Sequence, residues 1–257
     1  MKLETKDLLT GDEISSKEFL ELIDFSIKLK EENKTVKGKQ LLENKTLAML
    51  FEKPSTRTRV SFETGMKQLG GHTIILSLNE MQHSRGESVE DTAKTLSGYV
   101  DGIVARVYEH SFIEDLAKHA TVPVINGLSN SYHPCQTLAD FMTIKEHKKK
   151  FKDLKIAWIG DGNNVCNSLI FGCSKTQTDI VIATPKGFEP NPEVVKKASE
   201  NTTIDLTTDP ESAVKDADIV MTDTFTSIHT SDPKRTEKFL PSFQVNESLM
   251  EKAKNDA

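Results

Sequence analysis

Hydroxyl and guanidinium side chains are concentrated in one short stretch of this chain, Phe51–Glu63, which reads FEKPSTRTRVSFE. Ser55 and Thr56 offer hydroxyl groups, and Arg57 and Arg59 add two positive charges within three residues. If a helix starts here, its first backbone N–H groups are unpaired and add to the positive potential. Hydroxyls, guanidinium groups and unpaired N–H groups are the donors that bind phosphate, so the stretch predicts an anion site that fits a phosphate group.

The surrounding sequence predicts the strand and the helix that position this stretch. Thr46–Phe51 is rich in β-prone and apolar residues, and Pro54 ends the strand because proline has no backbone N–H to donate. From Val60 onward the pattern is helical and runs to two glycines typical of a helix end: Phe62, Met66, Leu69, Gly70 and Gly71. The simpler interpretation is an ordinary N-cap with solvated arginines, but cations at a helix N-terminus oppose the dipole unless they hold an anion.

Length, charge and cysteine usage limit the class of protein. The 257 residues suggest about two domains, and no apolar run approaches the roughly 18 residues that a membrane helix needs. The charged N-terminus lacks the apolar region of a secretory signal. A net charge of −6 argues against a general nucleic-acid binder. The cysteines form no CxxC pair and cannot all pair internally, so we expect a reducing, cytoplasmic location: Cys135, Cys166 and Cys173.

Strand-like and helical runs alternate along the chain. The strands are expected at Thr46–Phe51, Thr73–Leu78, Gly102–Val107, Val122–Ile125, Lys155–Ile159, Ile180–Thr184, Thr203–Leu206 and Asp218–Thr222. Helices are expected around Val89–Val100, Asn164–Lys175, Pro192–Glu200 and Pro210–Lys215. This alternation predicts an α/β protein with two doubly wound parallel-sheet domains, residues 1–133 and 151–257, joined by a long helix within residues 134–150.

Further polar residues follow the predicted strands of the first domain. Arg106 ends one strand, and His133 and Gln136 come after the loop that follows the next. Alone, such an arginine is most often a surface charge, and a histidine beside proline is most often a capping or core residue. Ligands of open parallel sheets bind at the carboxyl ends of the strands, so the shared placement of these residues favours one site.

The motifs around these residues resemble those of the aspartate/ornithine carbamoyltransferase family. Ser55–Arg59 resembles its carbamoyl-phosphate motif, and Glu52-Lys53 resembles the ornithine branch. Two further carbamoyl-phosphate motifs are similar to Ala105–Tyr108 and His133–Gln136. Gln82 matches a loop residue that reaches the same ligand and that can serve a neighbouring subunit in relatives. The resemblance therefore implies a homotrimer or a multiple of it.

The second half of the chain resembles the ornithine domain of this family. Trp158–Asn164 is similar to its first strand and turn, and Asn164 matches the residue that holds the amino-acid substrate. Thr222–Ser227 resembles the segment in which Asp223 and Ser227 contact ornithine, and Ile228 follows it as an apolar wall. The resemblance thus implies that the first domain binds carbamoyl phosphate and the second binds ornithine.

The implied reaction moves the carbamoyl group from carbamoyl phosphate to the side-chain amine of ornithine, giving citrulline and phosphate. Ser55, Thr56, Arg57 and Thr58 would hold the phosphate. Arg106 and His133, together with Thr58, would donate to the carbonyl oxygen, where one such donor is typically worth about 2.7–4 kcal/mol. Gln136 would orient the carbamoyl amide, and Asp223 would hold the amine. The resemblance implies neither a cofactor nor a metal, and neither a membrane nor a nucleic acid as partner.

The sequence departs from the family pattern beside Asp223. The ornithine branch carries Asp-x-Trp-x-Ser-Met-Gly, and here Phe225, Ile228 and His229 stand for the tryptophan, methionine and glycine. Isoleucine is stiffer than methionine, and histidine lacks the free positive φ of glycine. The sequence therefore leaves closure of this loop on a substrate open. The resemblance also implies a later His-Cys-Leu-Pro motif and a late arginine beyond Ala257, so both a fragment and a shortened, catalytically weak relative remain interpretations.

Other functions remain as alternatives. Gly160-Asp-Gly162 follows a predicted strand and opens a helix, as in a dinucleotide-binding oxidoreductase, but Val165 stands where the third glycine belongs. A non-catalytic protein that binds carbamoyl phosphate is a further alternative. Within the family, aspartate or a modified ornithine could be the acceptor, although Asp223 favours a cationic side chain because it would repel aspartate.

Overall fold

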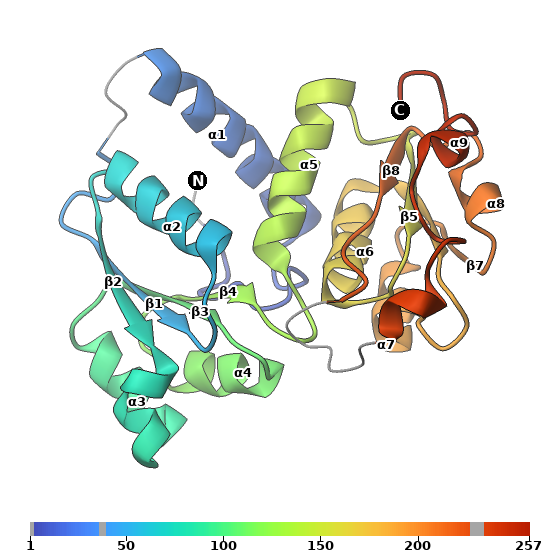
Figure 1. Ribbon diagram of the computed structural model, residues 1–257. Coiled ribbons are helices and arrows are strands. Elements are labelled where there is room, and N and C mark those ends of the chain that lie inside the picture. Colours follow the sequence, from blue (N-terminus) through green and yellow to red (C-terminus); the bar gives the residue numbers. More distant parts are fainter. Residues whose placement is uncertain (1–2, 36–39, 227–233) are drawn as a thin grey trace. The chain divides into compact units, whose positions relative to one another are not determined.

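The computed structural model describes residues 3–35, 40–226 and 234–257. The chain divides into two compact units, Met1–Leu138 and Ala139–Ala257, and each contains its own four-stranded sheet (Figure 1). The strands of each sheet are all parallel. This confirms the predicted α/β class with two doubly wound parallel sheets.

In the first unit the sheet has the strand order β2-β1-β3-β4. The elements in chain order are α1 (Ser16–Thr35), β1 (Thr46–Phe51), α2 (Thr56–Gln68), β2 (His72–Ser77), η1 (Leu78–Glu80), η2 (Gln82–Arg85), α3 (Val89–Ser97), β3 (Gly102–Arg106), α4 (His110–His119) and β4 (Val124–Leu128). α5 (Pro134–Lys148) begins in this unit and continues into the second.

The two faces of β1 pack into two different cores because successive side chains of a strand point to opposite faces. Leu47, Met49 and Phe51 pack with Met66 of α2 on one face. Ala48 and Leu50 face the other side, where apolar residues of α3 and α4 cover the sheet. Figure 1 shows α2 on one side of this sheet, with α3 and α4 on the other. Both faces are thus buried, as expected for a parallel sheet.

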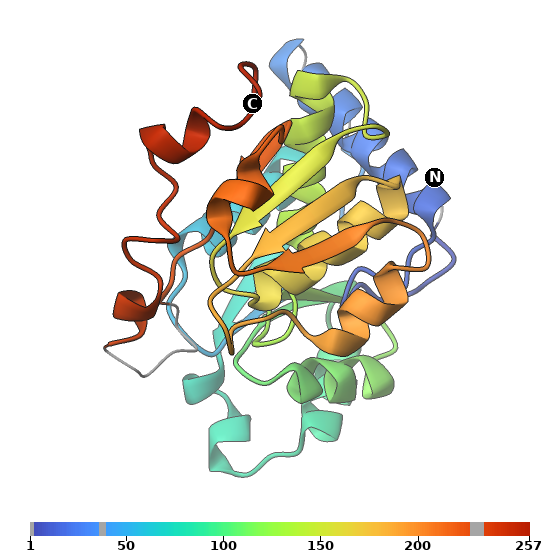
Figure 2. The ribbon, with the colours of Figure 1, turned by 90° about the vertical axis from the view of Figure 1, so that its right-hand side faces the viewer.

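The second unit repeats the architecture with the strand order β7-β6-β5-β8. Its elements are β5 (Lys155–Ile159), α6 (Asn164–Thr176), β6 (Asp179–Ala183), α7 (Pro192–Ala198), β7 (Ile204–Thr207), α8 (Pro210–Val214), β8 (Ile219–Met221), η3 (Arg235–Lys238) and α9 (Glu247–Met250). Figure 2 shows its strands, yellow to orange, running side by side. One core of this unit joins Ala157 and Ile159 of β5 to Val214, Phe239 and Leu249.

One strand differs clearly from its predicted position. The sequence predicts a strand at Val122–Ile125, but β4 runs from Val124 to Leu128. It starts late because Pro123 has no N–H for the ladder. It continues through Gly127 because that glycine packs against β3, where a Cβ would lie 3.1 Å from a side-chain carbon of Val104. The other predicted strands agree with the observed ones to within one residue at each end.

Two helices lie where the sequence analysis placed none. α1 buries only a narrow apolar stripe that includes Phe19 and Ile23, because most of its surface is charged. α4 buries Ile113 and Leu116 against the sheet, although it is only ten residues long. Among the described residues, no helix combines the length and apolar character needed to cross a membrane.

The close packing of β4 predicts opposite effects for two glycine-to-alanine substitutions. Gly127→Ala should destabilise the fold by about 1–3 kcal/mol, since the added methyl group crowds Val104 and the carbonyl of Ala105. Gly65→Ala is the matched control, because nothing lies within 4 Å of the added Cβ in the middle of α2. There, alanine should stabilise the helix by about 0.5–1 kcal/mol. Urea unfolding of both variants measures the difference, and equal effects would contradict the packing account.

Candidate active site

The carboxyl ends of three neighbouring strands form one edge of the first sheet. β1 pairs with β3 so that Phe51 lies opposite Arg106, and β3 pairs with β4 so that Arg106 lies opposite Leu128. The segments that follow these strands carry the residues singled out in the sequence, as strand ends of a parallel sheet should. A ligand of this sheet is therefore expected to bind at this edge.

The helix that follows β1 starts at Thr56, with Ser55 at its N-cap position. Ser55 has extended backbone angles (φ −144°, ψ 116°), but its hydroxyl makes no capping hydrogen bond. The first turn of α2 also contains no acidic residue. The structure thus corrects the capping role considered for Ser55, and the first-turn N–H groups stay available to an anion.

Arg106 lies against the first turn of α2. Its Nη1 donates a hydrogen bond to Thr58 Oγ1 at 2.8 Å. Burial, and after it the positive charge of Arg57, lower the pKa of Arg106, so the two guanidinium groups are close enough to repel each other. Within the described part of the chain, no carboxylate lies at ion-pair distance from either arginine. The site thus gathers positive charge where a dianion such as phosphate would bind.

His133 lies beside the same guanidinium group. Burial, with the charge of Arg106 as a second cause, lowers the pKa of His133 to about 4. Its imidazole is therefore neutral at neutral pH and carries one N–H donor. A neutral donor next to Arg106 can hydrogen-bond to a ligand oxygen without adding to the positive charge of Arg57 and Arg106.

Two other predicted ligand residues lie at the borders of this group. Gln136 is exposed in the first turn of α5, and its N–H donates to the carbonyl of His133 at 3.1 Å. Gln82 is exposed at the start of η2. Among the described residues, no hydrogen bond joins the Gln82 side chain to Ser55–Thr58. The structure therefore brings together Arg57, Thr58, Arg106 and His133, whereas Gln82 stays apart.

Glu52 braces this edge, a role that the sequence did not predict. Its Oε2 accepts the N–H of Tyr108 at 2.6 Å, and its own N–H donates to the carbonyl of Arg106 at 3.0 Å. Lys53 adds a cation–π contact, with Nζ 4.3 Å from the centre of the Tyr108 ring. Together these contacts tie the segment before α2 to the end of β3. In the sequence, the only signal for this role was the position of Glu52 directly after the predicted strand.

The second unit has an acidic counterpart at the carboxyl edge of its own sheet. Asp223 follows β8, and its Oδ2 accepts a hydrogen bond from Asn163 Nδ2 at 2.9 Å. Asn163 also caps α6, since its Oδ1 accepts the N–H groups of Val165 and Cys166. Asn164, the predicted substrate residue, is buried in the first turn of the same helix. One asparagine amide thus fixes both a helix start and Asp223, a role that the sequence analysis did not assign.

A partly buried cation stabilises the segment that carries Asp223. Arg235 forms an ion pair with Asp161, and its Nε donates to the carbonyl of Phe225 at 3.0 Å. Its guanidinium carbon also lies 4.7 Å from the ring centre of Phe188. Burial raises the pKa of Asp161, the Arg235 contact opposes this, and the charge of Asp223 adds to it. Arg235 therefore joins the turn after β5 to the segment after β8.

The glycines considered for dinucleotide binding have a different function in this turn. A Cβ on Gly162 would lie 2.2 Å from the backbone nitrogen of Pro190. The N–H of Gly162 donates to the carbonyl of Phe188 at 2.8 Å. The chain's own backbone therefore occupies the space that a pyrophosphate would need at this glycine. Ser227 and Ile228, predicted to contact ornithine, lie outside the described residues.

Family comparison agrees with this division of the chain into two sites. Residues 6–146 match the carbamoyl-P binding domain of aspartate/ornithine carbamoyltransferases, and residues 152–257 match their Asp/Orn binding domain. The chain belongs to the aspartate/ornithine carbamoyltransferase family. In carbamoyltransferase terms, the positive edge of the first sheet lies in the carbamoyl-P binding domain, and Asp223 lies in the Asp/Orn binding domain.

Individual carbamoyltransferases are similar over the whole chain. The ornithine carbamoyltransferase of Cenarchaeum symbiosum is 57% identical over 257 residues, which is 100% of this chain and 85% of that protein. The one from Methanocaldococcus jannaschii is 49% identical and matches 97% of this chain and 83% of its own length. The solved ornithine carbamoyltransferase of Pyrococcus furiosus has a TM-score of 0.94 at 47% identity, covering 100% of this chain and 84% of that one.

The surroundings of His133 predict an unusual titration. Its imidazole should remain neutral down to about pH 4, well below the usual value near 6.5. The pKa is lowered in the folded state, so neutral His133 contributes to the free energy of unfolding. This contribution is complete above about pH 6.5 and is lost as the pH falls toward 4. Imidazole NMR signals, assigned with His133→Gln, measure this directly. A midpoint at or above 6.5 would contradict the buried, arginine-adjacent placement.

Proposed function

We propose that this carbamoyltransferase moves the carbamoyl group of carbamoyl phosphate to the side-chain amine of ornithine, giving citrulline and phosphate. The observation that carries the proposal is the joined group of Thr58, Arg106 and His133 beside the open N-terminus of α2. The relatives named ornithine carbamoyltransferase support the choice of acceptor. Residues 1–133 would bind carbamoyl phosphate, residues 134–150 connect, and residues 151–257 bind ornithine.

The phosphate end of the substrate binds at the start of α2 in this proposal. Ser55 and Thr56 supply hydroxyl groups, and the first-turn N–H groups and Arg57 complete the donors. Gln82 would reach the ligand from another subunit, which fits its separation from this group. As the C–O bond to phosphate breaks, negative charge grows on the leaving group, and these donors stabilise it.

The carbonyl oxygen of the substrate would accept hydrogen bonds from Arg106, His133 and Thr58. The hydroxyl oxygen of Thr58 already accepts a hydrogen bond from Arg106. The hydroxyl proton of Thr58 is therefore available to donate to another acceptor. Neutral His133 donates one N–H, and Gln136 orients the carbamoyl amide. The neutral amine attacks the carbonyl carbon through its nitrogen lone pair, and the carbonyl oxygen becomes an oxyanion. Collapse of the oxyanion expels phosphate, and the newly bonded nitrogen loses a proton.

The ornithine end depends on Asp223 in this proposal, with Asn164, Ser227 and Ile228 as further contacts. An amine with a pKa near 10.4 is almost fully protonated at neutral pH, and the carboxylate attracts that cation. The ammonium ion must release one proton before its nitrogen can attack, so the site selects the neutral form of the amine for the reaction. Asn163 donates a hydrogen bond to one oxygen of Asp223, and this bond fixes the orientation of the carboxylate. The same negative charge disfavours aspartate as the acceptor.

Citrulline formation and phosphate binding test the proposal together. Arg57→Ala should weaken phosphate binding about tenfold to a hundredfold, since hydrogen bonds to charged groups are worth about 1.5–3 kcal/mol. Arg59→Ala is the matched control, because Arg59 lies 3.8 Å from Glu63 along α2 instead of beside Arg106. Calorimetry with phosphate and a citrulline assay with the full chain are the measurements. Binding without citrulline would favour a non-catalytic carbamoyl-phosphate protein, and equal losses in both variants would refute the assignment of Arg57.

The double role of Asn163 predicts a separation of stability from ornithine affinity. Asn163→Ser keeps an oxygen that caps α6 but removes the donor to Asp223. The ornithine KM should rise about threefold to tenfold, the size of one net hydrogen bond, with little change in Tm. Asn163→Ala should also lose about 1 kcal/mol of stability with the cap. An unchanged ornithine KM in both variants would show that Asn163 does not position Asp223.

The family also suggests an oligomeric state, a metabolic role and a cellular location for this chain. We expect a homotrimer or a multiple of it, which light scattering can measure, and a place in arginine biosynthesis. The free cysteines Cys135, Cys166 and Cys173 support a reducing, cytoplasmic location. Burial raises the pKa of Cys135 to about 12, so this thiol stays protonated and unreactive although it lies in a site motif.

A further inference from the structure

The loop between β4 and α5 has an internal support that the reaction scheme does not use. This loop begins at Ser129 and ends at His133, directly before Pro134 opens α5. Its backbone closes on itself, because the N–H of Ser129 donates to the carbonyl of Tyr132 at 3.0 Å. Any shift of this turn would therefore move the imidazole of His133.

The hydroxyl of Ser129 lies at the centre of the turn and is fully buried. It accepts the N–H of Tyr132 at 3.2 Å and the N–H of Ser131 at 3.4 Å. Asn126 Nδ2 approaches the same oxygen at 3.3 Å. A serine oxygen has only two lone pairs, so these donors share its accepting capacity and its single proton is directed elsewhere.

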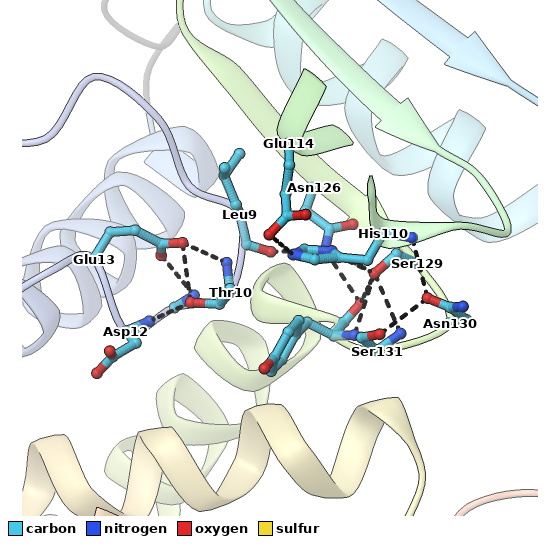
Figure 3. Close-up of polar contacts among 12 residues, drawn as sticks. Leu9, Thr10, Asp12, Glu13, His110, Glu114, Asn126, Ser129, Asn130 and Ser131 are labelled. Atoms are coloured by element: carbon cyan, nitrogen blue, oxygen red, sulfur yellow. Dashed lines mark hydrogen bonds and ion pairs between the residues drawn. The ribbon is translucent and has the colours of Figure 1, made fainter. Parts of the chain in front are cut away.

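The nearest acceptor for that proton is His110, at the start of α4. Its Nδ1 lies 2.9 Å from Ser129 Oγ, which is the shortest of these contacts. Figure 3 shows His110 and Ser129 within this group of polar residues. Burial lowers the pKa of His110, while the carboxylates of Glu114 and Glu13 act in the opposite direction. A neutral His110 that accepts at Nδ1 carries its proton on Nε2, which lies 3.9 Å from Glu114 Oε1. This protonation state satisfies Nδ1, whereas the buried Nε2 makes no hydrogen bond among the described residues.

His110 contacts the same turn at two more points. Its backbone N–H donates to Asn130 Oδ1 at 3.1 Å, and its ring packs edge-on against Tyr132 with 4.9 Å between the centres. Asn126 extends the network by donating to the carbonyls of Leu9 at 2.7 Å and Tyr132 at 3.3 Å. The turn is therefore held from α4, from β4 and from the N-terminal segment, all within the first unit.

We propose that His110 and Ser129 are positioning residues of the carbamoyl-phosphate site, which hold the turn so that His133 points at the substrate carbonyl. Neither residue is expected to touch the substrate, since both act through the turn. The inference rests on the proposed function of His133. It assigns a role to a histidine and a serine that lie 19 residues apart and that carry no family motif named above.

The test compares two ligands in the full-length chain. Ser129→Ala and His110→Leu should weaken carbamoyl phosphate binding about tenfold to a hundredfold, the cost of misplacing a site group by about 1 Å. Binding of inorganic phosphate should be unchanged, because it depends on α2 and not on the turn. His110→Asn should restore affinity, since its amide can replace Nδ1. Hydrogen exchange in peptides covering residues 129–136 should speed up in the first two variants only.

Two control variants separate this role from simpler ones. Glu114→Gln removes the charge near Nε2, and Ser131→Ala removes a hydroxyl of the same turn that bonds Asn130. Both should bind like the wild type, and a loss in Glu114→Gln equal to that in His110→Leu would overturn the role of the Nδ1 contact. Equal losses for both ligands, or none, in Ser129→Ala would also overturn it, and this small substitution decides the matter if His110→Leu does not fold. If the wild type binds neither ligand, the proposed function fails first and the inference falls with it.

Discussion

Repulsion between Arg57 and Arg106 is the constraint around which the first unit is organised. Like charges held at the edge of one sheet raise the energy of the fold unless a ligand offsets them, and here the positive end of α2 adds to the cost. The sheet itself tolerates this because both of its faces are buried by independent cores. Glu52 then fixes the backbone at the end of β3, next to Arg106, by accepting the N–H of Tyr108. The stable sheet thus offsets the repulsion between the two arginines, and a bound anion would neutralise their charge.

The second unit carries the opposite charge at its strand ends, where the carboxylate of Asp223 lies. If Asp223 binds the cationic side chain of ornithine, as proposed above, its protein partner should be a neutral donor and not a cation. Asn163 meets this need, while Arg235 is directed to Asp161 and to the backbone of Phe225. The guanidinium group of Arg235 therefore supports the segment without pairing with Asp223. Both units contain a four-stranded parallel sheet, but the strand orders differ, β2-β1-β3-β4 in the first and β7-β6-β5-β8 in the second. The sign of charge at the strand ends differs as well, and in the proposed function this is why each unit fits a different substrate.

Local signals in the sequence were enough to predict β1, the start of α2 and the charged residues at the strand ends. They failed where tertiary packing decides the structure. Asn126-Gly127 resembles a turn, yet Gly127 continues β4 because the neighbouring strand leaves no room for a side chain. The contact between His110 and Ser129 was invisible, since helical or strand spacing does not relate residues on α4 and after β4. Asn163 was overlooked beside Asn164 because capping and substrate roles look alike in an Asn-Asn pair.

The neutral state of His133 follows first from its burial and then from the arginine beside it, and it also suits the proposed reaction. A cationic imidazole would attract the phosphate in the ground state as strongly as in the transition state, which tightens binding without lowering the barrier. A neutral N–H instead gains most when the carbonyl oxygen becomes an oxyanion. Such a donor is effective only if its direction is fixed before the substrate arrives, because reorientation during the reaction would cost energy. The buried turn around Ser129 provides that fixed direction, so the positive edge and the rigid loop depend on each other.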